Sequence, residues 1–268
     1  MNAADEHLKV IREELDREHA ENAPETSEPV IRLEDVHLSF DQPILKGVTM
    51  EAREGETLMV AGESGSGKST ILKLILRLLV PDAGIITVLE EDVVKLTFQE
   101  ALQLRKQIGM VFQNAALFDS LTVFDNVAYP LRENTDFDED RIADIVREKL
   151  DFVDLDADKV TGQLPSQLSG GMRKRVGMAR AIATDPCIIL YDEPTAGLDP
   201  LTVGTINALI RKLQRELNVT SILVTHDIRA GFQVANRVNL LREGEMVFDG
   251  SPEQMVAANE GYIKQFLS

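Results

Sequence analysis

A glycine-rich segment between a strand-like and a helix-like stretch is the feature that most constrains this chain. Thr57 to Ala61 is a short apolar run, and residues 62–69 read Gly-Glu-Ser-Gly-Ser-Gly-Lys-Ser. From Thr70, apolar residues recur at helical spacing until Pro81 interrupts them. Glycines let successive N–H groups converge on phosphate oxygens, at a helix N-terminus whose dipole favours negative charge. The pattern predicts a phosphate-binding loop in an α/β protein.

Two side chains of this loop have distinct expected roles. Lys68 is expected to reach the outer phosphates of a nucleotide, and the Ser69 hydroxyl is expected to bind Mg²⁺. A glycine-rich turn that contains Lys-Ser by chance is the alternative, but it does not account for the strand before the loop and the helix after it. The remaining residues predicted to bind nucleotide are Gly62, Ser64, Gly65, Ser66, Gly67 and Thr70.

An acidic pair follows a second apolar run. Residues 188–191 read Ile-Ile-Leu-Tyr, and Asp192 and Glu193 come next. Carboxyl ends of strands are where α/β proteins bind ligands. Asp192 suits Mg²⁺, and Glu193 is placed to orient and deprotonate an attacking water, a role worth about 10²–10⁴-fold in rate. Alone, the pair is better explained as an Asp-Glu-Pro turn at a strand end.

Two further segments suit phosphate chemistry less specifically. Ser169 is a plausible helix cap, followed by Gly170 and Gly171, which allow close backbone approach. An ordinary capped helix start explains this segment equally well in isolation. His226 ends the apolar run of residues 221–225, and a lone histidine is more often structural.

In this order and spacing, the four segments resemble the nucleotide-binding subunits of ATP-binding-cassette (ABC) transporters. The resemblance covers residues from about 30 to 250. It implies an α/β P-loop NTPase fold: a RecA-like core with a mainly parallel sheet, plus a helical subdomain at about residues 115–182. It also implies an ATPase coupled to transmembrane transport, with ATP and Mg²⁺ as cofactors, an ATP-dependent homodimer and an integral-membrane permease as partner.

The resemblance also assigns roles to individual residues. In this family the segment at Ser169 contacts the γ-phosphate of ATP held by the other subunit, although the family usually has Gln where this chain has Met172. A histidine at the position of His226 contacts the γ-phosphate and helps to hold the attacking water. The glutamine at the position of Gln113 senses Mg²⁺ and the membrane part of the transporter.

Two positions in the family pattern concern the dimer interface and the nucleotide base. Residues 196–199, which end at Asp199, match the loop that crosses the interface. Phe40 lies where the family stacks an aromatic ring on adenine. A phenylalanine in the core of a strand explains Phe40 equally well.

Three segments narrow the resemblance to the Mla/Mce branch, the ATPases of bacterial phospholipid transport. They are residues 116–127, 130–133 and 170–176. This branch implies phospholipid cargo, an Mce-domain lipid-binding protein, often a small STAS-domain subunit, and a peripheral location on the cytoplasmic face of the bacterial inner membrane. Three alternatives remain open: an importer of another small solute, a non-transport ABC protein acting on ribosomes or DNA, and a nucleotide-binding regulator without turnover.

Charge and composition limit the other classes of function. The net charge is −17; residues 1–29 carry nine acidic side chains against three basic, and residues 133–159 carry eleven against four. No clustered basic face suited to nucleic acid is visible. No apolar run approaches the roughly 18 residues that span a bilayer, and the start of the chain does not resemble a secretory signal. With a single cysteine, Cys187, we expect a soluble protein of a reducing compartment.

The chain is expected to have three parts. Residues 1–29 form an acidic helical extension, residues 30–250 the nucleotide-binding domain, and residues 251–268 a short helical tail. Within the domain we expect an acidic helix over about 136–160, a helix from the Ser169 segment to about 182, and a hairpin around Gly244. Cys187 is expected to enter a buried strand as a small apolar residue.

Overall fold

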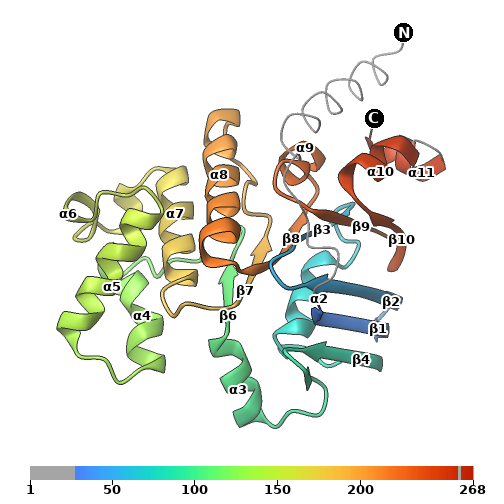
Figure 1. Cartoon of the computed structure of the whole chain (residues 1–268), viewed down its shortest axis with the longest axis horizontal. Coiled ribbons are helices and arrows are strands. Elements are labelled where there is room, and N and C mark those ends of the chain that lie inside the picture. The colour runs from blue at the N-terminus through green and yellow to red at the C-terminus, as the bar shows by residue number, and fades with distance from the viewer. Residues whose placement is uncertain (1–27, 259–260, 268) are drawn as a thin grey trace. The chain divides into compact units, whose positions relative to one another are not determined.

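The computed structural model describes residues 28–258 and 261–267 (Figure 1). The described residues fall into two compact units: the first combines those up to Thr97 with those from Thr220 onward, and the second is Phe98–Val219. The acidic extension expected at residues 1–29 lies almost wholly outside the described residues. No helix among the described residues is both long enough and apolar enough to cross a membrane.

The first unit contains an antiparallel sheet with the strand order β2-β1-β4-β5. Its two long strands pair over most of their length, and the alternating burial along β1 places Ile31, Leu33, Val36 and Leu38 in the core. Such alternation is typical of a sheet with one covered face. The strands are β1 (Pro29–Ser39), β2 (Pro43–Arg53), β4 (Ala83–Val88) and β5 (Glu91–Asp92).

Parallel strands form the second sheet of the first unit. β3 (Thr57–Gly62) lies between β8 (Thr220–Thr225) and β9 (Arg237–Arg242) and is parallel to both, while β10 (Glu245–Gly250) pairs antiparallel with β9. All six residues of β3 are buried, because neighbours cover both faces of a central parallel strand. The hairpin predicted around Gly244 is confirmed as β9 and β10.

Four helices complete the first unit: α2 (Lys68–Ile75), α9 (Ile228–Phe232), α10 (Pro252–Ala258) and α11 (Gly261–Leu267). The two C-terminal helices are packed onto the sheet, because Met255, Val256 and Leu267 share one buried cluster with β3 and β9 residues (Figure 1). α2 ends earlier than the apolar pattern predicted. Arg77 adopts a left-handed backbone with φ 55°, and its guanidinium donates to the Val93 and Leu96 carbonyls.

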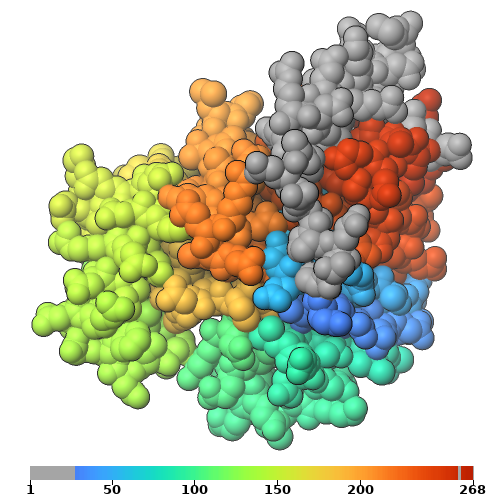
Figure 2. Space-filling model, viewed as in Figure 1, coloured from blue at the N-terminus to red at the C-terminus, as the bar shows by residue number. Residues whose placement is uncertain are grey.

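The second unit contains a parallel strand pair and most of the helices. β6 (Ile108–Val111) and β7 (Ile188–Asp192) pair with Val111 opposite Tyr191. The helices are α3 (Phe98–Lys106), α4 (Val123–Asn134), α5 (Glu139–Phe152), α6 (Ala157–Val160), a 3₁₀ turn (Pro165–Gln167), α7 (Gly170–Ala181) and α8 (Pro200–Leu217). In Figure 2, the residues of α4 and α5 form one continuous yellow-green surface.

The single acidic helix predicted at about 136–160 is wrong in its extent. The structure has two helices there, α5 and the four-residue α6. Asp138 caps α5 by accepting a 2.8 Å hydrogen bond from the Arg141 N–H. The helix then stops before Asp154, whose left-handed backbone (φ 58°) cannot continue it. The helix predicted to run to about 182 is confirmed as α7, which begins at Gly170 and ends at Ala181.

Candidate functional site

The glycine-rich loop leaves β3 and enters α2 within the first unit. Two of its glycines are required by geometry. A Cβ on Gly62 would lie 2.4 Å from the Leu241 carbonyl oxygen of β9, and Gly67, which caps α2, has φ 106°. The loop therefore lies directly against the neighbouring strand and turns sharply into the helix, as the sequence predicted.

Lys68 and Ser66 make this loop suited to a phosphate group. The Lys68 side chain is buried, and its ammonium donates to the carbonyls of Gly62 at 2.8 Å and Glu63 at 2.9 Å. The Ser66 hydroxyl is buried without a hydrogen-bond partner. A buried polar atom of this kind needs an explanation, and a phosphate oxygen bound in the loop would provide one.

His226 directly follows β8, and the phosphate loop leaves the end of the neighbouring strand, β3. β3 and β8 are parallel with Ala61 opposite Thr225, so the residues that follow each strand leave the same edge of the sheet. The next residue, Asp227, donates its N–H to the Thr225 hydroxyl and caps α9 by accepting from Ala230, both at 3.0 Å. The first unit thus brings together two of the predicted segments.

The second unit brings Gln113 to the same strand edge as Asp192 and Glu193. Gln113 follows β6 by two residues, while Asp192 ends β7, and the two strands are parallel neighbours. Glu193 has a left-handed backbone, with φ 49°. A non-glycine residue in this conformation is uncommon and is found where the surrounding structure enforces it.

Lys174 was not singled out from the sequence, although it contacts this edge directly. Its side chain is buried, and its ammonium donates to the main-chain carbonyls of Gln113 and, at 3.4 Å, of Glu193. Burial lowers the pKa of Lys174, and the negative charge of Glu193 opposes that effect. One signal was available: Lys174 precedes buried Met178 by four residues and therefore lies on the apolar side of α7.

Ser169 and Asp199 begin two helices whose N-terminal turns are in contact. Ser169 caps α7 by accepting a 3.2 Å hydrogen bond from the Met172 N–H, and Asp199 caps α8 by accepting from Leu201 and Thr202. A Cβ on Gly171 would lie 2.7 Å from the Thr202 side chain. The hydrogen bond from the Thr202 hydroxyl, with those from the backbone, holds the pKa of Asp199 below its ordinary value.

Phe40 is not a core residue. It follows β1 and is 62% exposed, so the alternative of a buried strand phenylalanine is wrong. Its ring is accessible to a stacking partner. The expectation for Cys187 is also wrong, because β7 begins only at Ile188 and Cys187 is exposed at its entrance.

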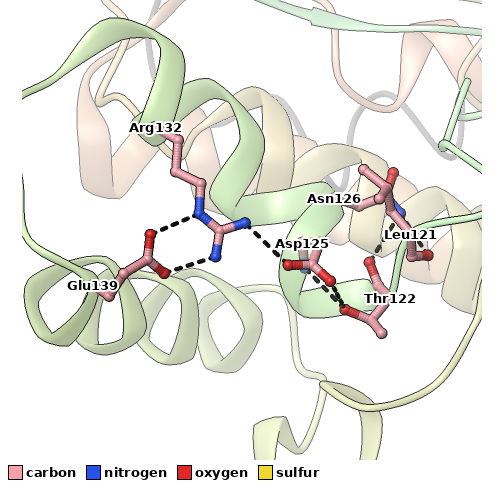
Figure 3. Close-up of polar contacts among 6 residues, drawn as sticks. All are labelled: Leu121, Thr122, Asp125, Asn126, Arg132 and Glu139. Carbon is pink, nitrogen blue, oxygen red and sulfur yellow. Dashed lines mark hydrogen bonds and ion pairs between the residues drawn. The ribbon is translucent and has the colours of Figure 1, made fainter.

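A polar network organises the segment before α4 and the start of α5 (Figure 3). The buried Asn126 side chain accepts from the Phe118 N–H and donates to three carbonyls, those of Phe118, Leu121 and Thr122. Arg132 donates to both carboxylate oxygens of Glu139, at 2.8 and 2.7 Å, and to Asp125 at 3.0 Å. The Asn126 bonds hold the segment that precedes α4, and the Arg132 bonds join the last turn of α4 to the first turn of α5.

A pocket of about 320 Å³ opens in the second unit, and Phe112, the residue before Gln113, lines it. Three aromatic residues line it, Phe112, Phe118 and Tyr129, with exposures of 40%, 44% and 44%. The rings of Phe118 and Tyr129 lie 4.9 Å apart. Its other lining side chains include the basic residues Arg105, Lys106 and Arg180. Aromatic residues exposed together in this way are typical of a protein interaction site.

The phosphate loop follows a buried parallel strand, β3, and the acidic pair lies at the end of another parallel strand, β7. Together these two features define a P-loop nucleotide hydrolase. Residues 45–196, more than half of the chain, match the family model described as ABC transporter. The chain therefore belongs to the ABC transporter family, as an ATP-binding and ATP-hydrolysing subunit. This confirms the family resemblance and the α/β P-loop NTPase fold predicted from the sequence.

Known relatives support this assignment and differ in the cargo that their names give. The ATP-binding protein MlaF of the intermembrane phospholipid transport system of Haemophilus influenzae is 39% identical, over 85% of each chain. A probable ribonucleotide transport ATP-binding protein of Mycobacterium leprae is 38% identical, over 84% of this chain and 64% of that protein. A dimeric ATP-binding cassette solved with ADP and Pi has a TM-score of 0.76 at 33% identity, over 83% of this chain and 98% of the other.

Proposed function

We propose that this chain is a Mg²⁺-dependent ATPase that works as a homodimer beneath a membrane permease and powers phospholipid transport in the bacterial envelope. One observation carries the choice of cargo. The phospholipid-transport relative is similar to this chain over 85% of its own length, whereas the ribonucleotide-transport relative is covered over only 64%. The segments 116–127 and 170–176, with their Mla/Mce-like sequence, support the same choice.

The roles of the site residues in this proposal follow their placement. Lys68 and the otherwise unpartnered Ser66 hydroxyl would bind phosphate oxygens. Glu193 would take a proton from the attacking water, and His226 would help to hold that water. Phe40 would stack on the adenine.

The donor set suits Mg²⁺ as well. Ser69, Gln113 and Asp192 offer a hydroxyl, an amide and a carboxylate oxygen, the hard ligands that Mg²⁺ prefers. Among the described residues there is no cluster of three or more His, Cys, Asp or Glu placed to hold a metal ion. Phosphate oxygens and water would complete the coordination of the ion. The ion would neutralise charge on the phosphates during transfer.

The dimer is supported by the surface at the starts of α7 and α8. Ser169, Gly170 and Gly171 present backbone N–H groups at a helix N-terminus, which attracts anions. Leu201, in the first turn of α8, is 87% exposed, and an apolar side chain so exposed beside Asp199 suits burial against a second copy. Two ATP molecules would each be held between one chain's phosphate loop and its partner's Ser169 segment.

The aromatic pocket of the second unit is the surface we assign to the permease. Phe112, which lines the pocket, directly precedes Gln113, so a permease segment bound there would be sensed at the strand edge that carries Asp192 and Glu193. The basic residues in its lining favour an occupant that carries acidic side chains around an apolar anchor. The further partners in this proposal are an Mce-domain lipid-binding protein and a small STAS-domain subunit, with the complex on the cytoplasmic face of the inner membrane.

Deletion of the gene tests the cargo. Cells that lack the protein are expected to have a leaky outer envelope and altered lipid asymmetry, without a nutrient requirement. Restoration by the parent chain but not by Glu193→Gln would tie the effect to hydrolysis. The main alternative is a small-solute importer, which the name of the mycobacterial relative favours. A strict growth requirement for one solute, with an intact envelope, would establish that alternative instead.

A further inference from the structure

The buried ammonium of Lys174 holds two main-chain carbonyls that belong to different strand ends. One is the carbonyl of Gln113, after β6, and the other that of Glu193, after β7. Lys174 is only 6% exposed. An ammonium so buried is costly unless hydrogen bonds compensate for its lost hydration, so these two bonds are a condition of its burial. They also fix the two carbonyls to a single point on α7.

The backbone at or near both carbonyls adopts a left-handed conformation, which surrounding contacts must hold in place. Glu193 has φ 49°, and Ala115 and Ala116, just after Gln113, have φ 59° and 46°. Left-handed non-glycine residues are higher in energy than ordinary backbone and persist only where surrounding contacts hold them. Lys174 supplies such contacts at Gln113 and Glu193.

A second side chain of α7 also holds the backbone that follows Gln113. The Arg180 guanidinium donates to the carbonyls of Ala115 and Ala116, both at 2.7 Å. A Cβ on Gly177, between the two basic residues, would lie 3.1 Å from the Ala115 Cβ. α7 therefore holds residues 113–116 at two points and allows close approach of their backbone between them.

The same helix begins at the Ser169 cap, five residues before Lys174. A single α-helix moves as a stiff element over so short a span. We propose that Lys174 is a positioning residue that couples the Ser169 end of α7 to the backbone of Gln113 and Glu193, so that contacts made at Ser169 set the orientation of the Glu193 carboxylate. This inference rests on the proposed function, which makes Glu193 the base.

The test separates nucleotide binding from hydrolysis in the full chain with Mg-ATP. Lys174→Met keeps the apolar stem and removes the ammonium. We expect nucleotide affinity by calorimetry and ATP-driven dimer formation to stay near the parent values. The single-turnover rate should fall by about 10²-fold, the scale expected when a reacting group is misplaced by about 1 Å. Lys174→Arg, which restores a cation and donors, should recover part of that rate.

Arg175→Met is the matched control. It removes the adjacent positive charge from the same helix, but Arg175 donates to the Asp154 carbonyl and not to Gln113 or Glu193. Its hydrolysis rate should equal that of the parent. Thermal unfolding of every variant separates misplacement from unfolding. If Lys174→Met and Lys174→Arg both fail to fold, the positioning role is overturned, because Lys174 would then be required for stability.

The outcomes also separate this inference from the proposed function. Hydrolysis by Lys174→Met at the parent rate, while Glu193→Gln is inactive, would overturn the coupling role and leave the base intact. Equal losses of affinity and rate would overturn it too, because a coupling residue acts on the reaction step. Hydrolysis by Glu193→Gln at the parent rate would instead count against the proposed function itself.

Discussion

The Tyr262 hydroxyl of α11 donates a 3.0 Å hydrogen bond to the carboxylate of Glu63, the second residue of the phosphate loop. The Arg242 guanidinium lies 4.0 Å from the centre of the Tyr262 ring. Desolvation, with the bond to Glu63, raises the pKa of Tyr262, so the phenol keeps its proton at neutral pH. These residues line a cavity of about 280 Å³ together with Ser64, Gly65 and Ser66. The C-terminal helix therefore contacts the nucleotide loop directly.

Tyr262→Phe removes this hydroxyl and keeps the ring on Arg242. Without the hydrogen bond, the Glu63 carboxylate is less well held and repels an incoming phosphate more strongly. We expect nucleotide affinity to weaken by about twofold to tenfold, which corresponds to one ordinary hydrogen bond of about 0.5–1.5 kcal/mol. Calorimetry measures it, with Tyr129→Phe, a partly exposed tyrosine of the second unit, as the control. Unchanged affinity would mean that the C-terminal helix does not influence the loop.

Lys68→Ala should abolish tight nucleotide binding. No other side chain of the loop carries a positive charge, and a charge-assisted bond to phosphate in a partly dry site has no ready substitute. Calorimetry with Mg-ATP checks this. Lys73→Ala, an exposed lysine of the same helix, should bind as the parent does. Near-normal affinity of Lys68→Ala would contradict the phosphate-loop assignment.

Glu193→Gln should keep nucleotide binding and lose turnover. The amide preserves the shape and hydrogen bonding of the side chain and removes the base, a loss of about 10²–10⁴-fold in rate. ATP should then trap a stable dimer that light scattering detects. Glu216→Gln changes an exposed carboxylate of α8 and should leave the rate unaltered. Turnover by Glu193→Gln at the parent rate would show that another group is the base.

Mixing two defective chains tests whether each nucleotide is shared between subunits. One chain carries Lys68→Ala, and the other carries Ser169→Arg, whose bulky side chain should obstruct the partner's γ-phosphate site. Each homodimer should fail. In the heterodimer, a shared arrangement leaves one site with both defects and one with neither.

The readout for the mixture is single-turnover hydrolysis, or ATP-driven association of tagged chains, because one good site need not cycle alone. Hydrolysis or ATP-driven association that appears only in the mixture supports nucleotide sites that are shared between subunits. No recovery, with heterodimers confirmed through their tags, would mean that each chain builds its own site.

The Arg132 network predicts a pH dependence of stability. The Thr122 hydroxyl first, and Arg132 second, hold the pKa of Asp125 below its ordinary value of 3.8. Arg132 likewise lowers the pKa of Glu139 below 4.5. A carboxyl whose pKa is lower in the folded state contributes stability above its unfolded pKa and loses it as the pH falls through the folded pKa. The free energy of unfolding should therefore decrease as the pH falls below about 4.5, the higher of the two ordinary pKa values.

Arg132→Met should lower the unfolding midpoint at pH 7 and reduce the further loss between pH 5 and pH 3. Urea unfolding at both ends of that range measures the two effects. Arg141→Met, an exposed arginine of α5, serves as the control and should follow the parent. If Arg132→Met loses as much stability in acid as the parent does, the network is not the cause of the dependence.

The sequence was sufficient for the parts of the site that depend on local pattern. The phosphate loop, the acidic pair at the end of β7 and the capped start of α7 each combine a short motif with a strand or helix that periodicity reveals. Parallel strands then place His226 beside the loop and Gln113 beside Asp192, because the carboxyl ends of such strands share one edge.

Contacts from side chains to distant backbone were not predictable in this way. Lys174 bonds to carbonyls 61 and 19 residues away, and Tyr262 bonds to a carboxylate 199 residues away. Every residue type has the same backbone carbonyl, so no pattern of residue types predicts such a bond. The early ends of α2 and α5 depend likewise on left-handed residues, Arg77 and Asp154, whose types do not require that conformation.

The exposed position of Cys187 gives this protein a natural attachment point for a probe. It is the one cysteine of the sequence, and it lies at the entrance to β7, the strand that ends in Asp192. A maleimide dye or spin label would therefore react at a single known place without any engineering. In a homodimer, the two labels would form a symmetric pair whose separation, followed by energy transfer or pulsed electron resonance, reports each cycle of nucleotide binding and release.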